Sequence, residues 1–223
     1  MIRYIDTIKN VSLFNILSDD DLKLIAKIAV IRHLPKGYTV FQEGEKGDAL
    51  YIIVSGKVKV SLYDDEGREY ILDYIGKDGF FGELSLLDDL PRSANIITTE
   101  MCEFLVLKRD NFLRLLMENP KITINILKVM AKRLRAADER IKGLAFMSVE
   151  GRILKYLIDV GEKSGIKIKN HIVIENGPTQ IEIASSCGCS RETVSRMLKN
   201  LTNKGILTVR KRHYTLYTGN LML

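Results

Sequence analysis

The sequence lacks the features that mark membrane-spanning and secreted proteins. No run of about eighteen apolar residues occurs, so we expect no membrane-spanning helix. Residues 1–6 do not show the charged and then apolar layout of a signal peptide, and we therefore expect a cytoplasmic location. With 46% apolar and 28% charged residues, the composition is that of an ordinary globular protein. The 223 residues are enough for two modest domains, each with its own core.

Cysteine and histidine are also scarce. The three cysteines, Cys102, Cys187 and Cys189, are an odd number without framework spacing, which argues against a disulfide scaffold. Cys187 and Cys189 have the spacing of half a metal site, but nothing nearby in the sequence completes it and the three histidines are scattered. We therefore interpret the thiols as small apolar core residues, and predict no metal, iron–sulfur or haem site.

Charge is unevenly distributed along the chain. Residues 1–118 carry 15 Lys and Arg against 20 Asp and Glu, a net charge of −5. Residues 119–145 carry 7 against 2, and residues 146–223 carry 12 against 6, so that their net charges are +5 and +6. This pattern indicates that only the C-terminal part meets a polyanion.

Short apolar runs separated by glycines dominate the sequence between about residues 31 and 107. Many short strands with regular turns are typical of a small barrel or sandwich. Helices are expected on both sides, over residues 5–30 with Ser18 as an N-cap, and over 112–118 with Asp110 as a cap. The predicted strands are 49–54, 57–63, 70–75, 94–99 and 103–107.

Two short motifs in this region carry the chemistry of a ligand site: Gly-Glu-Leu-Ser from Gly82 and Arg-Ser-Ala from Arg92. A glycine lets backbone approach a ligand closely, and the residues after it can open a helix whose N–H groups favour an anion. Arg92 offers a planar fork of donors to a phosphate, and Ser93 adds a hydroxyl. Glu83 can accept a hydrogen bond from a sugar hydroxyl. The motifs therefore suit a sugar phosphate; the alternative is a Glu83–Arg92 ion pair that pins a surface loop.

A strand closed by a glycine turn, Gly-Asp-Ala-Leu-Tyr-Ile-Ile-Val-Ser-Gly-Lys-Val over residues 47–58, lies upstream. Together with the two motifs it resembles the cyclic-nucleotide-binding domain and its phosphate-binding cassette. The resemblance implies that Arg92 and Ser93 hold the cyclic phosphate and that Glu83 binds the ribose 2′-hydroxyl. The ligand-binding residues that it implies here are Gly82, Glu83, Leu84, Ser85, Arg92, Ser93 and Ala94.

A long helix is predicted next, with Asn119 as N-cap, Pro120 as its first residue and its end near Phe146. Apolar residues recur along it at alternating spacings of three and four, a heptad pattern that favours two helices packed in parallel, and hence a homodimer. The alternative is a single helix docked on its own barrel. Gly143 weakens the helix near its end, which suits a hinge. We call these apolar residues the seam: Leu127, Met130, Leu134, Ala137, Ile141 and Leu144.

The C-terminal part has the pattern of a winged helix-turn-helix. Ser148 is expected to cap a helix, and a hairpin is expected over 166–174. Thr179 and Glu182 form a capping-box pair at the start of the next helix, and Gly188 supplies the turn. Two predicted strands, 206–209 and 213–217, form the wing. Ser190 is expected to cap the second helix of the motif, whose inner face would be Val194, Met197, Leu198 and Leu201.

The outer face of this second helix is polar and basic. Arginine reads guanine through two hydrogen bonds and glutamate accepts from the cytosine amine, so Arg191, Glu192 and Arg196 are candidate base readers. Hydroxyl and ammonium groups suit phosphates, which fix register without reading sequence. The alternative is a face that is merely solvated. The candidate phosphate-binding residues are Thr179, Ser190, Lys199 and the basic residues of the wing, which are Arg210, Lys211 and Arg212.

Residues 144–146, 151–153 and 188–194 resemble the family of the cyclic-AMP receptor protein (catabolite activator), the CRP/FNR family of bacterial transcription regulators. The family implies an α+β fold with an N-terminal, jelly-roll-like β-roll over 1–118, a dimerisation helix over 119–146 and a winged helix-turn-helix over 147–223. It implies cyclic AMP as the effector and a homodimer bound to double-stranded DNA at a palindromic, TGTGA-like operator. RNA polymerase is the further partner expected.

The family also implies three ligand contacts from the long helix. Arg133 matches a position that braces Glu83 or the phosphate. A threonine and a serine contact adenine in the receptor, but the matching residues here are Ala137 and Asp138. Ala137 can make no such hydrogen bond, whereas Asp138 can accept from adenine or from guanine, so the identity of the base stays open.

Two other functions are alternatives to ligand-gated transcription control. The same architecture can answer cyclic GMP or a cyclic dinucleotide, or bind DNA constitutively without a ligand. An enzyme that hydrolyses cyclic nucleotides is the second alternative, but it needs clustered metal ligands or a nucleophile beside a base. The scattered histidines provide neither, and we therefore predict that the protein is not an enzyme.

Overall fold

The computed structural model describes residues 2–217 and 219. The chain forms two compact units: residues 1–63 with 71–135, and residues 64–70 with 136–223. None of the helices in the described part combines the length and apolarity needed to span a bilayer.

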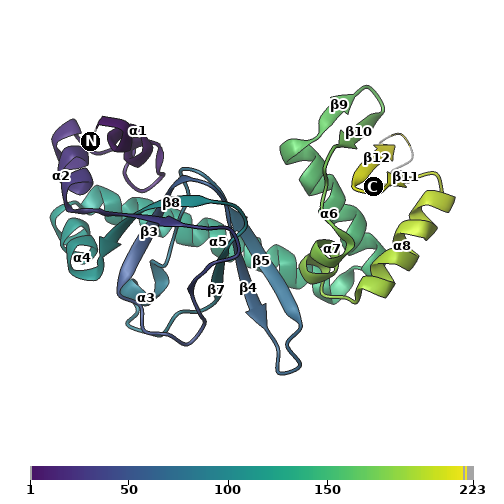
Figure 1. Cartoon of the computed structure of the whole chain (residues 1–223), viewed down its shortest axis with the longest axis horizontal. Coiled ribbons are helices and arrows are strands. Elements are labelled where there is room, and N and C mark those ends of the chain that lie inside the picture. The colour runs from purple at the N-terminus through teal and green to yellow at the C-terminus, as the bar shows by residue number, and fades with distance from the viewer. Residues whose placement is uncertain (1, 218, 220–223) are drawn as a thin grey trace. The chain divides into compact units, whose positions relative to one another are not determined.

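Two four-stranded sheets build the first unit, and the pairings recorded between their strands are antiparallel (Figure 1). The strand order of one sheet is β1 (Val30–Leu34), β8 (Cys102–Lys108), β3 (Ala49–Ser55) and β6 (Phe80–Phe81). The order of the other is β2 (Thr39–Phe41), β7 (Asn95–Thr98), β4 (Val58–Tyr63) and β5 (Glu69–Ile75). The five strands predicted from the sequence are all present, and the double sheet confirms the β-roll; β1, β2 and β6 were missed.

The central strand β3 explains why this unit has two cores. Successive side chains of a strand point to opposite faces, and both faces of β3 are apolar and buried. Leu50 and Ile52 pack in a core that includes helical residues, whereas Tyr51 and Ile53 pack in a second core. In that second core the ring of Tyr51 stacks on Phe81 with 5.2 Å between the ring centroids. Phe81 directly precedes Gly82 of the candidate ligand motif and lines the same cavity as that motif.

Four helices pack with the sheets of the first unit: α1 (Ile2–Asn10), α2 (Asp19–Ile28), α3 (Leu84–Leu87) and α4 (Arg109–Glu118). Ser18 caps α2 as predicted, accepting a hydrogen bond from the backbone N–H of Asp21 at 3.2 Å. The predicted cap Asp110 is wrong, because α4 begins at Arg109 and Asp110 lies in its first turn. The backbone N–H of Arg109 donates to the carbonyl of Asp48 at 2.8 Å, so a distant loop satisfies this helix start without a capping side chain.

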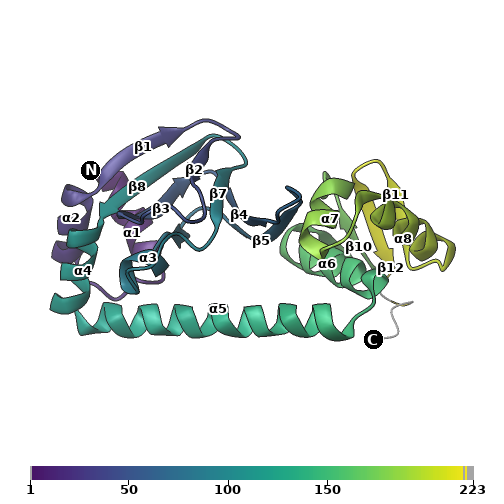
Figure 2. The ribbon, with the colours of Figure 1, turned by 90° about the horizontal axis from the view of Figure 1, so that it is seen from below.

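The long helix α5 (Pro120–Phe146) begins and ends where the sequence predicted (Figure 2). One side of its first half is buried against the helical core of the first unit, through Ile122 and Ile126. Another side is uncovered: Leu127, Leu134 and Ile141 of the seam are 62%, 64% and 64% exposed. The helix therefore both docks on its own barrel and presents an apolar face that residues 2–217 and 219 leave uncovered.

The second unit is a winged helix-turn-helix. Its sheet is antiparallel in the order β11-β12-β10-β9. Ser148, Ser190 and the Thr179–Glu182 capping box take their predicted places, and the Gly188 turn is left-handed with φ +61°. The inner face of α8 is buried as predicted, except that Met197 is half-buried. The elements are α6 (Val149–Ser164), β9 (Ile166–Ile168), β10 (His171–Ile174), α7 (Gln180–Cys187), α8 (Arg191–Asn203), β11 (Leu207–Arg210) and β12 (His213–Tyr217).

Candidate functional sites

Gly82 lies between β6 and α3, where the backbone of the ligand motif turns close to Arg92. Its φ of +87° is a left-handed conformation that side chains rarely adopt. A Cβ at this position would lie 2.8 Å from Nη1 of Arg92 and 3.0 Å from the carbonyl oxygen of Ala49. Glycine is therefore required both by the backbone turn and by the closeness of Arg92.

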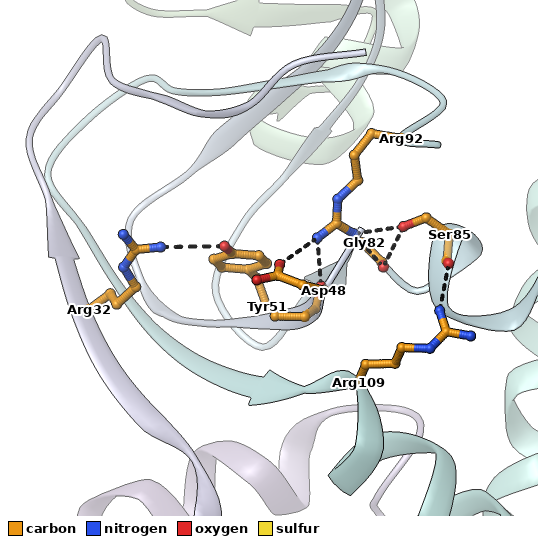
Figure 3. Close-up of polar contacts among 8 residues, drawn as sticks. Arg32, Asp48, Tyr51, Gly82, Ser85, Arg92 and Arg109 are labelled. Atoms are coloured by element: carbon orange, nitrogen blue, oxygen red, sulfur yellow. Dashed lines mark hydrogen bonds and ion pairs between the residues drawn. The ribbon is translucent and has the colours of Figure 1, made fainter. Parts of the chain in front are cut away.

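Arg92 is buried, with 4% of its surface exposed, and its guanidinium is held by the protein itself. Nη1 donates to the carbonyl of Gly82 at 2.7 Å and to Oγ of Ser85 at 2.9 Å (Figure 3). Nη2 donates to the carbonyl of Ala49 at 2.9 Å. The ring of Phe41 lies 4.1 Å from the guanidinium carbon, which adds a cation–π contact. Burial lowers the pKa of Arg92 from its ordinary value.

Glu83 is even more deeply buried, with 1% of its surface exposed. Its Oε1 forms an ion pair with Nη1 of Arg133 from α5, whose Nη2 donates to the carbonyl of Phe80 at 3.0 Å. Burial raises the pKa of the Glu83 carboxyl, and the charge of Arg133 opposes that shift. The predicted bracing of Glu83 by Arg133 is confirmed. The alternative of a Glu83–Arg92 pair pinning a surface loop is wrong, because both side chains are buried and have other partners.

Two polar atoms of this site have no hydrogen-bond partner among the described residues: Oε2 of Glu83 and Nε of Arg92. Leaving a buried donor or acceptor unpaired costs about 1–3 kcal/mol, so each needs a partner from elsewhere. One atom is an acceptor and the other a donor, and both residues line a cavity of about 80 Å³. A molecule with a hydroxyl and an anionic oxygen would pair with both. The other predicted residues that line this cavity are Gly82, Leu84, Ser85, Ser93, Ala94 and Arg133.

The three candidate base readers share one exposed surface of α8. Arg191, Glu192 and Arg196 are all exposed, whereas Val194 and Leu198 on the opposite side are buried. The carboxylate of Glu192 accepts hydrogen bonds from its own backbone N–H and from the side chain of Ser190, and these hold its pKa below the usual value. An ionised glutamate only accepts hydrogen bonds, which is what an amine on a base edge requires. The remaining residues that line this open surface are Gln180, Ser195 and Lys199.

Comparison with known proteins gives the same two functions to the two units. A cyclic nucleotide-binding domain model matches residues 31–119, and a Crp-like helix-turn-helix domain model matches residues 151–218. The cAMP-activated global transcriptional regulator CRP of Salmonella typhimurium is 33% identical over 90% of this chain and 95% of its own length. The chain belongs to the CRP/FNR family. It is a DNA-binding transcription regulator with a cyclic-nucleotide-binding domain, and not an enzyme.

Other members of the CRP/FNR family extend this likeness. The CRP-like cAMP-activated global transcriptional regulator of Mycobacterium tuberculosis is 37% identical over 77% of this chain and 76% of its own length. The structure of the c-di-GMP-responsive global regulator CLP of Xanthomonas campestris matches with a TM-score of 0.79 and 26% identity, covering 90% of this chain and 99% of that one. The catabolite activator protein of Thermus thermophilus matches with a TM-score of 0.56 and 30% identity, covering 93% and 94%.

Some residues in and around this cavity were not found from the sequence. Arg109 donates from Nη1 to the carbonyl of Ser85 at 3.2 Å (Figure 3). Arg109 also pairs with Asp89, and the two contacts tie α4 to the motif. Ala137 and Asp138, one turn beyond Arg133 on α5, are not among the residues that line the cavity, and their predicted contacts stay predictions. The apolar wall was missed because ordinary strand residues form it: Phe41, Val60, Ile75, Phe81 and Ile96.

The candidate phosphate-binding residues differ in how they are held. Oγ1 of Thr179 accepts from the backbone of Glu182 at 3.2 Å, so its hydroxyl proton is left to donate to a phosphate. Oγ of Ser190 accepts from the backbone N–H of Thr193 at 3.1 Å and also lies 3.1 Å from Oγ1 of Thr193. Lys199 and Lys211 are exposed, on α8 and at the wing turn. These positions suit phosphate binding, and the assignment stays a prediction.

Proposed function

We propose that the protein is a homodimeric regulator whose affinity for its operator is set by cyclic AMP. The observation that carries this proposal is that Oε2 of Glu83 and Nε of Arg92 have no hydrogen-bond partner among the described residues, while both residues line one cavity. A cyclic nucleotide offers a ribose 2′-hydroxyl to the first atom and a phosphate oxygen to the second. Ser93 would add a hydroxyl donor to the phosphate. The choice of cyclic AMP rests on two relatives that are named as cAMP-activated and are 33% and 37% identical.

A different signal is the second candidate, because one relative of the same fold is described as c-di-GMP responsive. Ala137 offers no hydrogen bond to a base, and Asp138 would accept equally from an adenine amine or a guanine N–H. Calorimetry with cyclic AMP, cyclic GMP and cyclic di-GMP decides between them. Tightest binding of cyclic AMP supports the proposal, and binding of none indicates a regulator that needs no nucleotide. No metal is part of the proposal.

Dimerisation is proposed from the uncovered face of α5. A second copy packed in parallel along the seam would bury Leu127, Leu134 and Ile141 in a two-stranded coiled coil. Sedimentation of the pure protein should therefore show dimers. The double variant Leu134→Lys and Ile141→Lys should give monomers, whereas the control Met117→Lys, at a 77% exposed apolar residue outside the seam, should remain dimeric. A monomeric wild type at micromolar concentration contradicts the proposal.

On DNA, we propose that the two copies place their α8 helices in successive major grooves, about 34 Å apart, as helix-turn-helix dimers do. Arg191, Glu192 and Arg196 would read the two halves of a TGTGA-like palindrome. Thr179, Ser190, Lys199 and Lys211 would bind the flanking phosphates. We place this regulator in the cytoplasm, where a bacterial DNA-binding protein meets its operator, and propose RNA polymerase as its further partner, as suits a global transcriptional regulator.

The gating proposal has a quantitative requirement. A ligand moves an equilibrium only by its different affinities for the two states, and a change from 1:99 to 99:1 needs roughly 5.5 kcal/mol. The DNA must in turn tighten ligand binding by the same factor. Fluorescence anisotropy of a labelled palindromic operator, with and without cyclic AMP, measures this factor. Equal affinity in both conditions refutes gating, and would leave DNA binding itself intact.

A further inference from the structure

The turn of the wing and the loop before α7 are joined by four hydrogen bonds, which we call the wing–loop contact. Nε of Arg212 donates to the carbonyl of Gly177 at 2.8 Å, and Nη2 of Arg212 donates to the carbonyl of Asn176 at 3.2 Å. The backbone N–H of Gly177 donates back to the carbonyl of Arg212 at 2.7 Å. The hydroxyl of Tyr214 donates to the carbonyl of Pro178 at 2.7 Å.

Packing makes the same junction rigid. Tyr214 is 1% exposed and belongs to the core of the second unit. A Cβ at Gly177 would lie 2.7 Å from Cδ2 of this ring, so the loop backbone rests directly on it. Pro178 is followed by Thr179, the N-cap of α7. The start of α7 is therefore fixed to the wing through both the ring and the guanidinium.

Adjacent basic residues of the wing thus have different surroundings. Arg212 uses Nε and Nη2, the edge with which arginine makes bidentate contacts, on two backbone carbonyls. Both residues are exposed, but Lys211 lies in a left-handed turn with φ +57°, and no hydrogen bond or ion pair to it is recorded within residues 2–217 and 219. In the sequence the two residues are equivalent basic neighbours. In the structure, Arg212 is hydrogen-bonded to the loop before α7, whereas Lys211 is available for another partner.

We propose that Arg212 is a positioning residue for DNA: it holds the wing turn against the start of α7, so that Lys211 and Thr179 meet the phosphates of one duplex together, and it does not bind a phosphate itself. This inference rests on the proposed phosphate roles of Lys211 and Thr179. If the wing is already held in place in the free protein, no free energy is spent on fixing it when the complex forms. A loose wing would have to be fixed on binding, and its affinity for DNA would be lower.

Salt dependence separates the two kinds of basic residue. Each phosphate neutralised contributes about −0.9 to the slope of log affinity against log salt concentration on duplex DNA. Lys211→Met and Arg212→Met are a matched pair, because both remove one charge and leave an unbranched apolar side chain. On a labelled duplex, Lys211→Met should make the slope shallower by about one. Arg212→Met should weaken binding by roughly tenfold and make the slope shallower by no more than Lys211→Met does, since Lys211 is displaced and no further phosphate contact is lost.

A double-mutant cycle separates positioning from a general loss of stability. In the Arg212→Met background, Lys211→Met should have a smaller effect than in the wild type, because the wing is already displaced. Lys199→Met, on α8, should have the same effect in both backgrounds. Arg212→Lys restores the charge but not the two-donor edge, so it should bind as weakly as Arg212→Met; it also serves if Arg212→Met does not fold.

The outcomes distinguish the inference from the function on which it rests. If Lys211→Met leaves the slope unchanged, the proposed phosphate role of Lys211 fails and the inference with it. If the double variant makes the slope shallower by about twice as much as Lys211→Met alone, or if Arg212→Lys binds with wild-type affinity, Arg212 is a direct phosphate ligand and the inference alone is overturned. Wild-type affinity in Arg212→Met, or full additivity with Lys211→Met, also overturns it.

Discussion

The ligand pocket and the recognition helix hold their functional side chains in opposite ways. Glu83 and Arg92 are 1% and 4% exposed, and the protein already satisfies most of their polar atoms. Arg191 and Arg196 are exposed on a helix whose other face is buried. A small ligand is thus met by a few fixed atoms that lack a partner. The proposed base readers are instead long, exposed side chains on a helix that its buried face holds in place.

Charge shows the same contrast. Residues 1–118 have a net charge of −5 and residues 146–223 one of +6. In the acidic part, a single buried arginine faces the cavity, which suits one small anion and disfavours a polyanion at long range. The basic part attracts DNA before any specific contact forms. Variants that exchange or remove these features test the contrast, beginning with the largest expected effect.

The largest effect is expected at Arg92. Arg92→Met should weaken cyclic-nucleotide binding by roughly 30-fold or more, because removing one partner of a buried charged contact costs about 2–5 kcal/mol. Calorimetry with cyclic AMP measures it. Arg114→Met is the matched control, since Arg114 bonds only to Asn111 on the surface of α4 in the recorded contacts, and it should bind as the wild type does. Equal loss in both variants would mean that Arg92 has no special place in the pocket.

The next effect is expected at Arg196, on the exposed side of the comparison. Arg196→Met should reduce operator affinity by about 5- to 150-fold, the value of a bidentate base contact of roughly 1–3 kcal/mol. It should also relax discrimination at one base pair, because only that pair loses its reader. Affinities for single-base operator variants check this. Uniform loss across all sequences would assign Arg196 to the phosphates.

A smaller effect is expected when the nucleotide lacks the 2′-hydroxyl that is proposed to contact Glu83. The wild type should bind 2′-deoxy cyclic AMP about tenfold more weakly than cyclic AMP, because one hydrogen bond to a charged acceptor is lost. Glu83→Ala should bind both nucleotides weakly and no longer distinguish them. Paired titrations give this ratio. Discrimination that persists in Glu83→Ala would place the 2′-hydroxyl elsewhere.

The smallest effect is a pH dependence of stability. Burial raises the pKa of Glu83 above its ordinary value of 4.5, so the folded protein holds this proton to a higher pH than the unfolded chain does. Its contribution to stability is therefore present below pH 4.5 and is lost as the pH rises through the folded pKa. Glu83→Gln stays neutral, so the free energy of unfolding of this variant, relative to wild type, should rise with pH above 4.5. Urea unfolding at several pH values measures the difference, and a falling difference would show that Arg133 outweighs burial.

The sequence predicted those parts of the fold that depend on near neighbours. The caps at Ser18, Ser148 and Ser190 were found because each pairs with a backbone group three residues on. The strand β1 was missed because four of its five residues are exposed, so no alternation shows. Asp110 was misplaced because the start of α4 is satisfied by Asp48, which lies 61 positions earlier in the chain.

The functional residues, too, were predicted where the evidence for them lies close together in the sequence. The motif at Gly82 and Arg92 was visible because its residue types are rare in combination and lie close in sequence. The commitment of Arg212 to the carbonyl of Gly177, 35 positions away, was not visible, because a basic residue in a turn has the same appearance whether it faces DNA or backbone. The apolar wall of the pocket was hidden for the same reason, since wall residues and core residues are alike in sequence.

Arg133 connects the candidate ligand pocket to the long helix α5. Its guanidinium touches Glu83 with one nitrogen and the carbonyl of Phe80 with another, and its own backbone is part of α5. In the proposed complex, a nucleotide hydrogen-bonded to Oε2 of Glu83 would therefore be connected to α5 through the side chain of Arg133. Because Arg133 itself belongs to α5, no loop separates the pocket contact from this helix of 27 residues.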